Sequence, residues 1–160
     1  MLKKALCIAV MSLTSAGAAT AAWASAMPAP RTFCGTGAAY DLQGQATQTF
    51  TFVTVNTPVA ATAMASHTTL TYSDGTTKVT DQTITDTAQG FKVDAAGWSG
   101  DALCFGNGLC QGYLKESASQ GLALTYVRDS EDTYRILLTR LENGQAQGFI
   151  KEVASPCEKR

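Results

Sequence analysis

The sequence contains very little histidine, the residue that activates the nucleophile in a Ser-His-Asp system. It has one histidine, His67, among 160 residues. A Ser-His-Asp nucleophile system would have to use that histidine, with Ser66 and Asp74 as nearby partners along the chain, and no Gly-x-Ser-x-Gly turn accompanies them. A structural or surface histidine is the better interpretation. We therefore expect a protein that is not an enzyme.

The usual metal-binding patterns are also missing. No Cys-x-x-Cys pair occurs, so we do not expect zinc. The acidic residues Asp129, Glu131 and Asp132 lack the glycine and the further oxygen ligands of a calcium loop, and they are better interpreted as a polar turn. We expect no metal and no cofactor. An acid–base pair would need two carboxyl groups in one cleft, and the candidates are Asp94, Asp101 and Glu116.

The chain has no excess of positive charge. It contains 12 Lys and Arg residues against 13 Asp and Glu residues. Without Lys3 and Lys4, which belong to the N-terminal segment described next, the balance is 10 against 13, a formal charge of −3. Because phosphate binding requires a concentrated basic face, we expect neither nucleic acid nor an anionic membrane surface as a partner.

Beyond its N-terminus, the chain has no apolar run near the ~20 residues that span a bilayer, so we expect no membrane span. The N-terminus differs. Lys3 and Lys4 precede an apolar stretch, and Ala-Ser-Ala at 24–26 has the small-x-small form that signal peptidase accepts. We expect residues 1–26 to be a signal peptide cleaved near Ala26. The mature chain of 134 residues (160 − 26) is then periplasmic or secreted.

The mature chain does contain four cysteines, an even number that predicts two disulfides in an exported protein. Four cysteines allow three pairings. We favour Cys104–Cys110, because these residues face each other across two strands if 106–108 is a three-residue hairpin loop. Cys34–Cys157 then joins the two ends of the domain. A bridge that closes more than a hundred residues contributes up to ~4–5 kcal/mol in the chain-entropy model.

Most of the remaining sequence alternates apolar and polar residues, with Gly or Asn at short intervals. In 45–55, for example, Phe50 and Phe52 alternate with threonine and valine. Asp74-Gly75 is a tight-turn pair between two such runs. This pattern predicts an all-β fold, a single antiparallel β-barrel or β-sandwich of roughly 8–10 short strands.

Two segments depart from the pattern. Residues 27–33 include two prolines and are expected to be extended or flexible, ahead of one disulfide-stabilised β domain at 34–160. Thr57-Pro58 followed by alanines resembles a helix start, so we expect at most one short helix near 57–66, with a plain connection between strands as the alternative. Such a helix could act as a lid over the mouth of a barrel.

Residues 107–119 and 143–155 share eight of thirteen positions, including an initial Asn-Gly. A solenoid or propeller should show its period at least three times, so we interpret the two segments as hairpins built from similar parts. The Lys-Glu pairs at 115–116 and 151–152 are expected to be solvated strand ends.

Only the first segment carries cysteines and is preceded by a tryptophan. Aromatic groups on a stiffened loop can bind a partner with little ordering cost. The candidate binding residues are Trp98, Phe105, Asn107 and Leu109. For Trp98 the alternative is a core position that covers one end of the barrel.

These observations favour a small exported binding or inhibitor protein that engages another protein, such as an inhibitor of a cell-wall hydrolase or an immunity protein against a toxin. The alternative is a lipocalin-like barrel that holds a small apolar ligand, which would require an apolar cavity of several hundred Å3.

Overall fold

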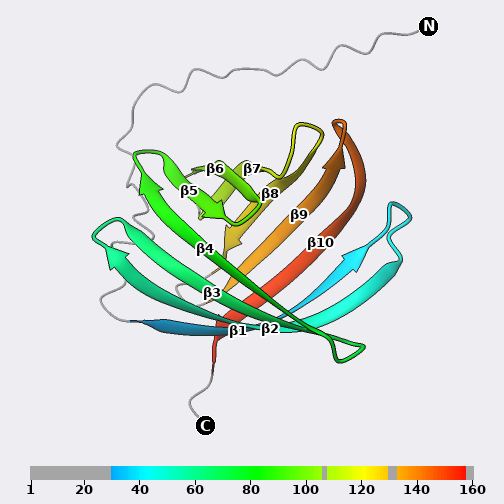
Figure 1. The fold of residues 1–160 in the computed structure, drawn as a ribbon, viewed down its shortest axis with the longest axis horizontal. Coiled ribbons are helices and arrows are strands. Elements are labelled where there is room, and N and C mark those ends of the chain that lie inside the picture. The colour runs from blue at the N-terminus through cyan, green and yellow to red at the C-terminus, as the bar shows by residue number, and fades with distance from the viewer. Residues whose placement is uncertain (1–29, 106–107, 130–132, 158–160) are drawn as a thin grey trace, which may run out of the picture.

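The computed structural model describes residues 30–105, 108–129 and 133–157, so the expected signal peptide and the candidate Asn107 lie outside the described residues. Within those ranges the chain forms ten β-strands and no helix (Figure 1). The strands are β1 (Arg31–Tyr40), β2 (Ala46–Ala60), β3 (Ala63–Tyr72), β4 (Thr77–Thr87), β5 (Gly90–Ala95), β6 (Trp98–Cys104), β7 (Leu109–Lys115), β8 (Gln120–Arg128), β9 (Tyr134–Glu142) and β10 (Gln145–Pro156).

The sheet closes on itself. Each strand pairs antiparallel with its neighbours in sequence, and β1 pairs with β10, which makes a ten-stranded up-and-down barrel. Full closure removes the free edges that a sandwich would keep. The all-β prediction is confirmed, and of its two alternatives the barrel is the observed one. No helix in the described part of the chain is both long and apolar enough to cross a membrane.

Residues that tolerate positive φ close the hairpins. Gly75, with φ +83°, lies in the turn between β3 and β4, where the Asp74 carboxylate accepts hydrogen bonds from the Thr76 backbone N–H and hydroxyl at 2.9 and 2.6 Å. Asn143 and Gly144, with φ of 52° and 76°, join β9 to β10. Few residues adopt such φ angles without strain. The Asp-Gly and Asn-Gly pairs in the sequence therefore predicted both turns.

The short helix that the sequence allowed near 57–66 does not form. β2 and β3 pair through this segment, with Thr57 opposite Ala65 and Pro58 opposite Met64. The pairing shifts register immediately after Pro58, at a bulge, which is a place where a residue without a backbone N–H is tolerated in a sheet. The alanines therefore continue an alternating strand instead of starting a helix.

The barrel has two different ends. The end that we call closed carries the start of β1, the end of β10 and the connections β2–β3, β4–β5, β6–β7 and β8–β9. The end that we call open carries the turns at 41–45, 73–76, 96–97, 116–119 and 143–144. At the open end β4 runs past β5, because their pairing begins only at Gln82 opposite Ala95. The tip of the β3–β4 hairpin therefore projects from the barrel, at the lower right of Figure 1.

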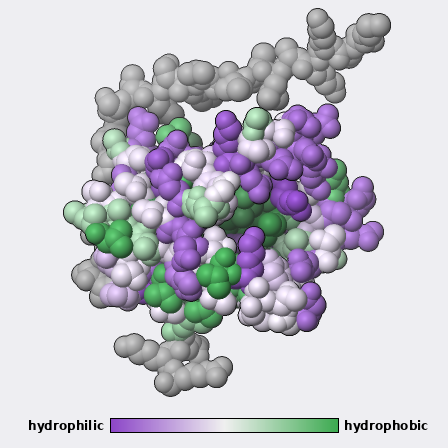
Figure 2. Space-filling model, viewed as in Figure 1, coloured by the Kyte–Doolittle hydropathy of each residue, from purple (hydrophilic) through white to green (hydrophobic). Residues whose placement is uncertain are grey.

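Many of the side chains that point into the barrel are buried, at both ends of the strands. The buried ones toward the closed end include Phe33, Met64, Phe91, Ala102, Cys110 and Ala154. Toward the open end, several inward apolar side chains are only partly buried, namely Leu70, Tyr72, Trp98, Leu122, Leu138 and Ile150. Figure 2 shows a hollow in this view of the molecule with apolar residues at its floor and hydrophilic residues around it. Partly buried apolar side chains therefore line part of the interior toward the open end.

Two phenylalanines of β2 fill the space beside β1. The rings of Phe52 and Phe50 lie over Gly35 and Gly37, where a Cβ on either glycine would overlap the ring. These pairs are directly opposite each other in the sheet. The glycines of β1 are therefore a packing requirement, since a side chain there would compete with the rings for the same volume.

Both expected disulfides are present. Cys34–Cys157 spans 123 residues of sequence and joins β1 to the residue after β10, where the barrel closes. Cys104–Cys110 crosses the β6–β7 hairpin between directly opposite residues. Two disulfides indicate an oxidising environment, such as the periplasm or the extracellular space.

The two similar segments lie at opposite ends of the barrel, since the β6–β7 turn is at the closed end and the β9–β10 turn is at the open end. Lys115 ends β7 as expected. The expectation that Lys151 and Glu152 end a strand is wrong, because β10 continues to Pro156. Alternation along β10 then leaves Lys151 exposed and turns Glu152 into the barrel.

Candidate functional site

The β6–β7 hairpin presents apolar side chains to solvent above a buried disulfide. Leu103 and Phe105 are 53% and 51% exposed, whereas Cys110 is fully buried beneath them. The Phe105 N–H donates a hydrogen bond to the Leu109 carbonyl oxygen at 2.8 Å, which closes the base of the turn. Two of the candidate binding residues, Phe105 and Leu109, therefore lie together at the closed end on a cross-linked hairpin.

Further exposed apolar side chains lie on the outside of β7, β9 and β10. Tyr113, Leu137 and Val153 point outward from β7, β9 and β10 and are 45%, 37% and 46% exposed. Together with Leu103 and Phe105 they form what we call the outer apolar face. Exposed apolar side chains also occur on the other side of the barrel, at Val53 on β2 and Val79 on β4.

Two cations border the outer apolar face, and both are held by neighbours. The Arg135 guanidinium lies 2.6 Å from a carboxylate oxygen of Asp129. The Lys151 ammonium lies 5.2 Å from the ring centroid of Tyr40 and 5.3 Å from that of Phe149. Apolar and aromatic side chains together with arginine are the composition that is enriched at protein–protein interfaces.

Trp98 does not belong to the outer apolar face. It begins β6 at the open end, whereas Cys104 ends the same strand at the closed end. A strand of this length spans about 20 Å, so Trp98 and Phe105 do not share one contact surface. Trp98 is partly buried and packs against the interior cluster that includes Cys110. The structure thus places it at the rim of the open end.

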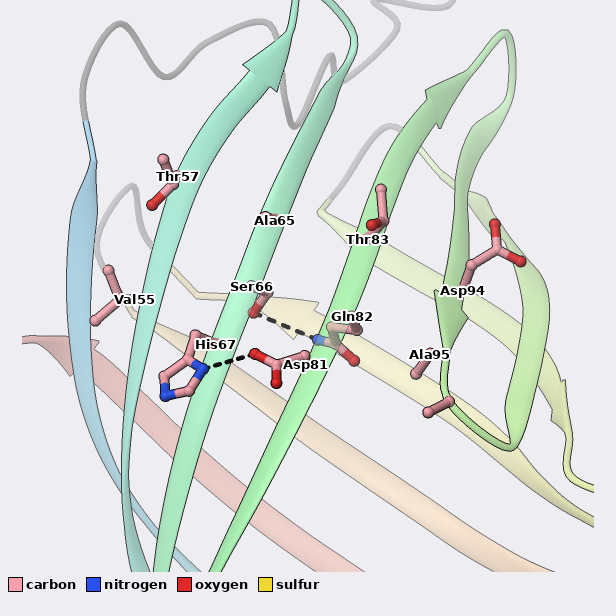
Figure 3. Close-up of a pocket in the computed structure, with 11 residues that line it drawn as sticks. Val55, Thr57, Ala65, Ser66, His67, Asp81, Gln82, Thr83, Asp94 and Ala95 are labelled. Carbon is pink, nitrogen blue, oxygen red and sulfur yellow. Dashed lines mark hydrogen bonds and ion pairs between the residues drawn. The ribbon is translucent and has the colours of Figure 1, made fainter.

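A separate hollow of about 480 Å3 lies on β2–β5 and contains the single histidine (Figure 3). His67 Nδ1 lies 2.6 Å from Asp81 Oδ1, and the two residues are directly opposite on β3 and β4. Both side chains are exposed, at 54% and 76%. Val55 and Ala65 also line this hollow. The pair is an exposed hydrogen-bonded dyad on a small apolar floor.

The described residues do not assemble a Ser-His-Asp nucleophile system around this dyad. Ser66 is buried, and its hydroxyl lies 3.5 Å from the Gln82 amide nitrogen. Because successive residues of a strand point to opposite faces, the Ser66 hydroxyl and the His67 ring are on opposite sides of the sheet. Asp74 instead stays in its own turn, where the hydrogen bonds from Thr76 lower its pKa.

A second hollow, of about 390 Å3, adjoins the first and shares Asp94 with it. Trp98 and Glu116 also line it. Of the three candidate carboxylates, Asp94 and Glu116 therefore share a hollow, and Asp101 is not in its lining. The Asp94 carboxylate is paired with the Lys92 ammonium at 3.0 Å.

The acidic turn after β8 does not form a metal site in the part that the structure describes. Asp129 is engaged by Arg135, and Glu131 and Asp132 lie outside the described residues. Across the described ranges, no three His, Cys, Asp or Glu side chains come together as metal ligands.

Sequence reasoning missed a polar cluster inside the barrel. Thr54 and Thr68 hydroxyl oxygens lie 2.9 Å apart, and the rings of Tyr126 and Tyr134 stack with centroids 5.5 Å apart. Desolvation raises the pKa of Glu152 in the same interior to about 7. The alternation of inward and outward side chains along β10, if extended past Ile150, turns Glu152 inward. This pattern would have predicted a carboxylate inside the barrel.

No protein family model matches the sequence, and the comparison with curated proteins gives no match. The functional conclusions therefore rest on the residues and their geometry.

Proposed function

We propose that this chain is an exported binding protein that engages another protein through its outer apolar face. The observation that carries the proposal is the exposure of Leu103 and Phe105 on either side of Cys104, in a hairpin that the Cys104–Cys110 disulfide cross-links. A cross-linked hairpin loses little conformational entropy when it docks. Burying a large apolar side chain contributes roughly 1.5–3 kcal/mol, so a few such residues are enough to anchor a partner.

The proposed location is the periplasm or the extracellular space, after cleavage of residues 1–26 near Ala26. The supporting features are the basic and apolar N-terminus, the Ala-Ser-Ala motif and two disulfides, which persist in oxidising compartments.

The proposed partner is a cell-wall hydrolase or a toxin that acts in the same compartment. A small, cross-linked barrel with an apolar hairpin surface is suited to occluding the active site of such an enzyme. Leu103 and Phe105 would insert into the partner, and the bordering cations Arg135 and Lys151 would contact polar groups at the rim.

Inhibition assays on purified peptidoglycan hydrolases test this proposal directly. The mature chain is added to a panel of enzymes that cleave the glycan or the peptide bonds of peptidoglycan, and hydrolysis rates are followed. We expect at least one enzyme to be inhibited, and Phe105→Ala and Leu103→Ser to weaken that inhibition by roughly tenfold or more each.

Val79→Ser is the matched control. Val79 is 53% exposed, as is Leu103, but it lies on β4, away from the outer apolar face. It should leave inhibition unchanged, and all three variants should melt close to the wild type. Equal potency of wild type, Leu103→Ser and Phe105→Ala would refute the proposed surface.

A second candidate function, binding of a small apolar ligand inside the barrel, is favoured by one observation. The inward side chains near the open end, such as Leu122, Leu138 and Ile150, are only partly buried. Fluorescence enhancement of the neutral apolar dye N-phenyl-1-naphthylamine tests it. We expect saturable binding at one site, and the absence of binding would remove this candidate.

A further inference from the structure

We propose that the barrel interior binds a small molecule with an aromatic or apolar body and a primary ammonium group, which is held by the Glu152 carboxylate and the aromatic rings beside it. This inference rests on the second candidate function, a ligand site inside the barrel. It adds the chemical class of the ligand and the residue that selects it.

Glu152 is placed to receive a ligand at mid-barrel. It is opposite Gly37 on β1 and Ile136 on β9. Gly37 has no side chain, and the ring of Phe50 lies over it. Glu152 is therefore flanked by an aliphatic side chain and an aromatic ring, with no hydrogen-bonding group at either directly opposite position.

Aromatic rings border the same region. The rings of Tyr126 and Tyr134 are stacked with centroids 5.5 Å apart, and Phe33 meets Tyr134 edge-on at 5.4 Å. Glu152 lies near enough to Tyr134 for its charge to affect that phenol. A carboxylate beside aromatic faces is the environment that suits an ammonium ion, which gains a charge-assisted hydrogen bond and cation–π attraction together.

The buried Glu152 carboxylate has no positively charged group among the causes that shift its pKa, so it is suited to receive a cation. Desolvation raises its pKa to about 7. The groups that face it are Gly37, Ile136 and Tyr134, of which only the phenol titrates, and burial raises the pKa of Tyr134 to about 12. Desolvation raises the pKa of Tyr126, and the charge of Arg128 on β8 opposes that rise; Arg128 is not among the causes that shift the pKa of Glu152. A bound ammonium would supply the missing positive charge.

The hydroxyl groups around the site offer further acceptors for an ammonium. Tyr134 is hydrogen-bonded to Thr54, whose hydroxyl also contacts Thr68 at 2.9 Å. Nearby in the same wall, the side-chain oxygen of Asn56 is buried without a hydrogen-bond partner. A buried acceptor that lacks a donor is costly, and a ligand N–H is one way to satisfy it.

The open end provides access. The partly buried inward side chains lie between Glu152 and that end, and Figure 2 shows a hollow with apolar residues at its floor. Trp98 lies at the rim of the open end. The sequence has two tryptophans, and the other, Trp23, falls in the expected signal peptide. Tryptophan fluorescence of the mature chain therefore comes from Trp98 alone, and a change in it reports that a ligand has bound.

The test uses two probes of nearly equal shape, phenethylamine and 2-phenylethanol, and isothermal titration calorimetry together with Trp98 fluorescence. We expect phenethylamine to bind at least roughly tenfold more tightly than 2-phenylethanol at pH 8. Because Glu152 must lose its proton to receive the cation, the affinity should fall about tenfold per pH unit below pH 7. The affinity for 2-phenylethanol should not change with pH.

Glu152→Gln should abolish the preference for phenethylamine, and Glu116→Gln, a surface carboxylate at the second hollow, should preserve it. Equal binding of both probes, or a preference that survives Glu152→Gln, overturns the inference even if the apolar dye binds inside the barrel. If neither the dye nor phenethylamine binds, the interior-ligand candidate falls as well. The wild-type comparison of the two probes decides the matter without any variant, so poor folding of Glu152→Gln would not block the test.

Discussion

The ring of Phe52 lies over Gly35, in the volume that a Cβ on that glycine would occupy. Phe50 has the same relationship to Gly37 two pairs further along. We predict that Gly35→Ala destabilises the fold by about 1–3 kcal/mol, because the added methyl group overpacks a filled interior. Urea unfolding of the variant measures the loss.

A double variant checks the stated cause. Phe52→Leu removes the ring from above Gly35 and should make Gly35→Ala much less harmful, so that the two changes are strongly non-additive. Additive losses in Gly35→Ala/Phe52→Leu would show that the ring is not what limits residue 35.

The two disulfides should differ in what they contribute to stability. Cys34–Cys157 closes 123 residues and Cys104–Cys110 closes six. In the chain-entropy model these loops correspond to about 5 and about 2 kcal/mol. We predict that Cys34→Ser/Cys157→Ser lowers the free energy of unfolding more than Cys104→Ser/Cys110→Ser does. Equilibrium unfolding of both variants without reductant compares them, and the reverse order would contradict the prediction.

The Cys104–Cys110 disulfide should contribute more to binding than its small contribution to stability suggests. It lies under Leu103 and Phe105, so its loss frees the hairpin that carries them. We predict that Cys104→Ser/Cys110→Ser weakens inhibition of the partner through the cost of ordering the hairpin, whereas Cys34→Ser/Cys157→Ser does not. Inhibition curves recorded well below both melting temperatures measure the effect. Equal losses in the two variants would indicate a general effect of instability.

Stability should fall as the pH rises from about 4.5 to about 7. Desolvation raises the folded-state pKa of Glu152 from 4.5 to about 7, so in this window the folded protein holds a proton that the unfolded chain has released. The contribution is fully present below the unfolded pKa and is lost by about pH 7, up to about 3 kcal/mol. Urea unfolding at several pH values without ligand records the slope.

Glu152→Gln is the control for that slope, because a glutamine does not titrate. The variant should show a flatter pH profile between these values and should exceed the wild type in stability above pH 7. A wild-type slope that persists in Glu152→Gln would assign the titration to another group.

Most strands and turns of this barrel could be predicted from the sequence, because the signals for them are local. The pair Asp74-Gly75 defined one hairpin, and alternation around Phe50 and Phe52 gave the inward face of β2. The pairing of Cys104 with Cys110 followed from the length of the loop between them. Each of these signals depends on residues that are neighbours in sequence or across one turn.

What the sequence did not reveal depends on long-range placement. Pro58 was misinterpreted because a bulge, which only the β2–β3 pairing shows, accommodates it. Trp98 and Phe105 were grouped because they are close in sequence, yet one strand holds them at opposite ends of the barrel. Glu152 was assigned to solvent because it was expected to be a strand end, whereas β10 continues to Pro156.

Nuclear magnetic resonance of the isotope-labelled mature chain with an inhibited hydrolase tests most directly whether the outer apolar face binds a protein. Signals of Leu103, Phe105, Tyr113, Leu137 and Val153 should shift or broaden on complex formation, and signals of His67 and Asp81 on the opposite wall should stay unchanged. Perturbations confined to the β2–β4 wall, with the β6–β7 hairpin unaffected, would contradict the proposed function.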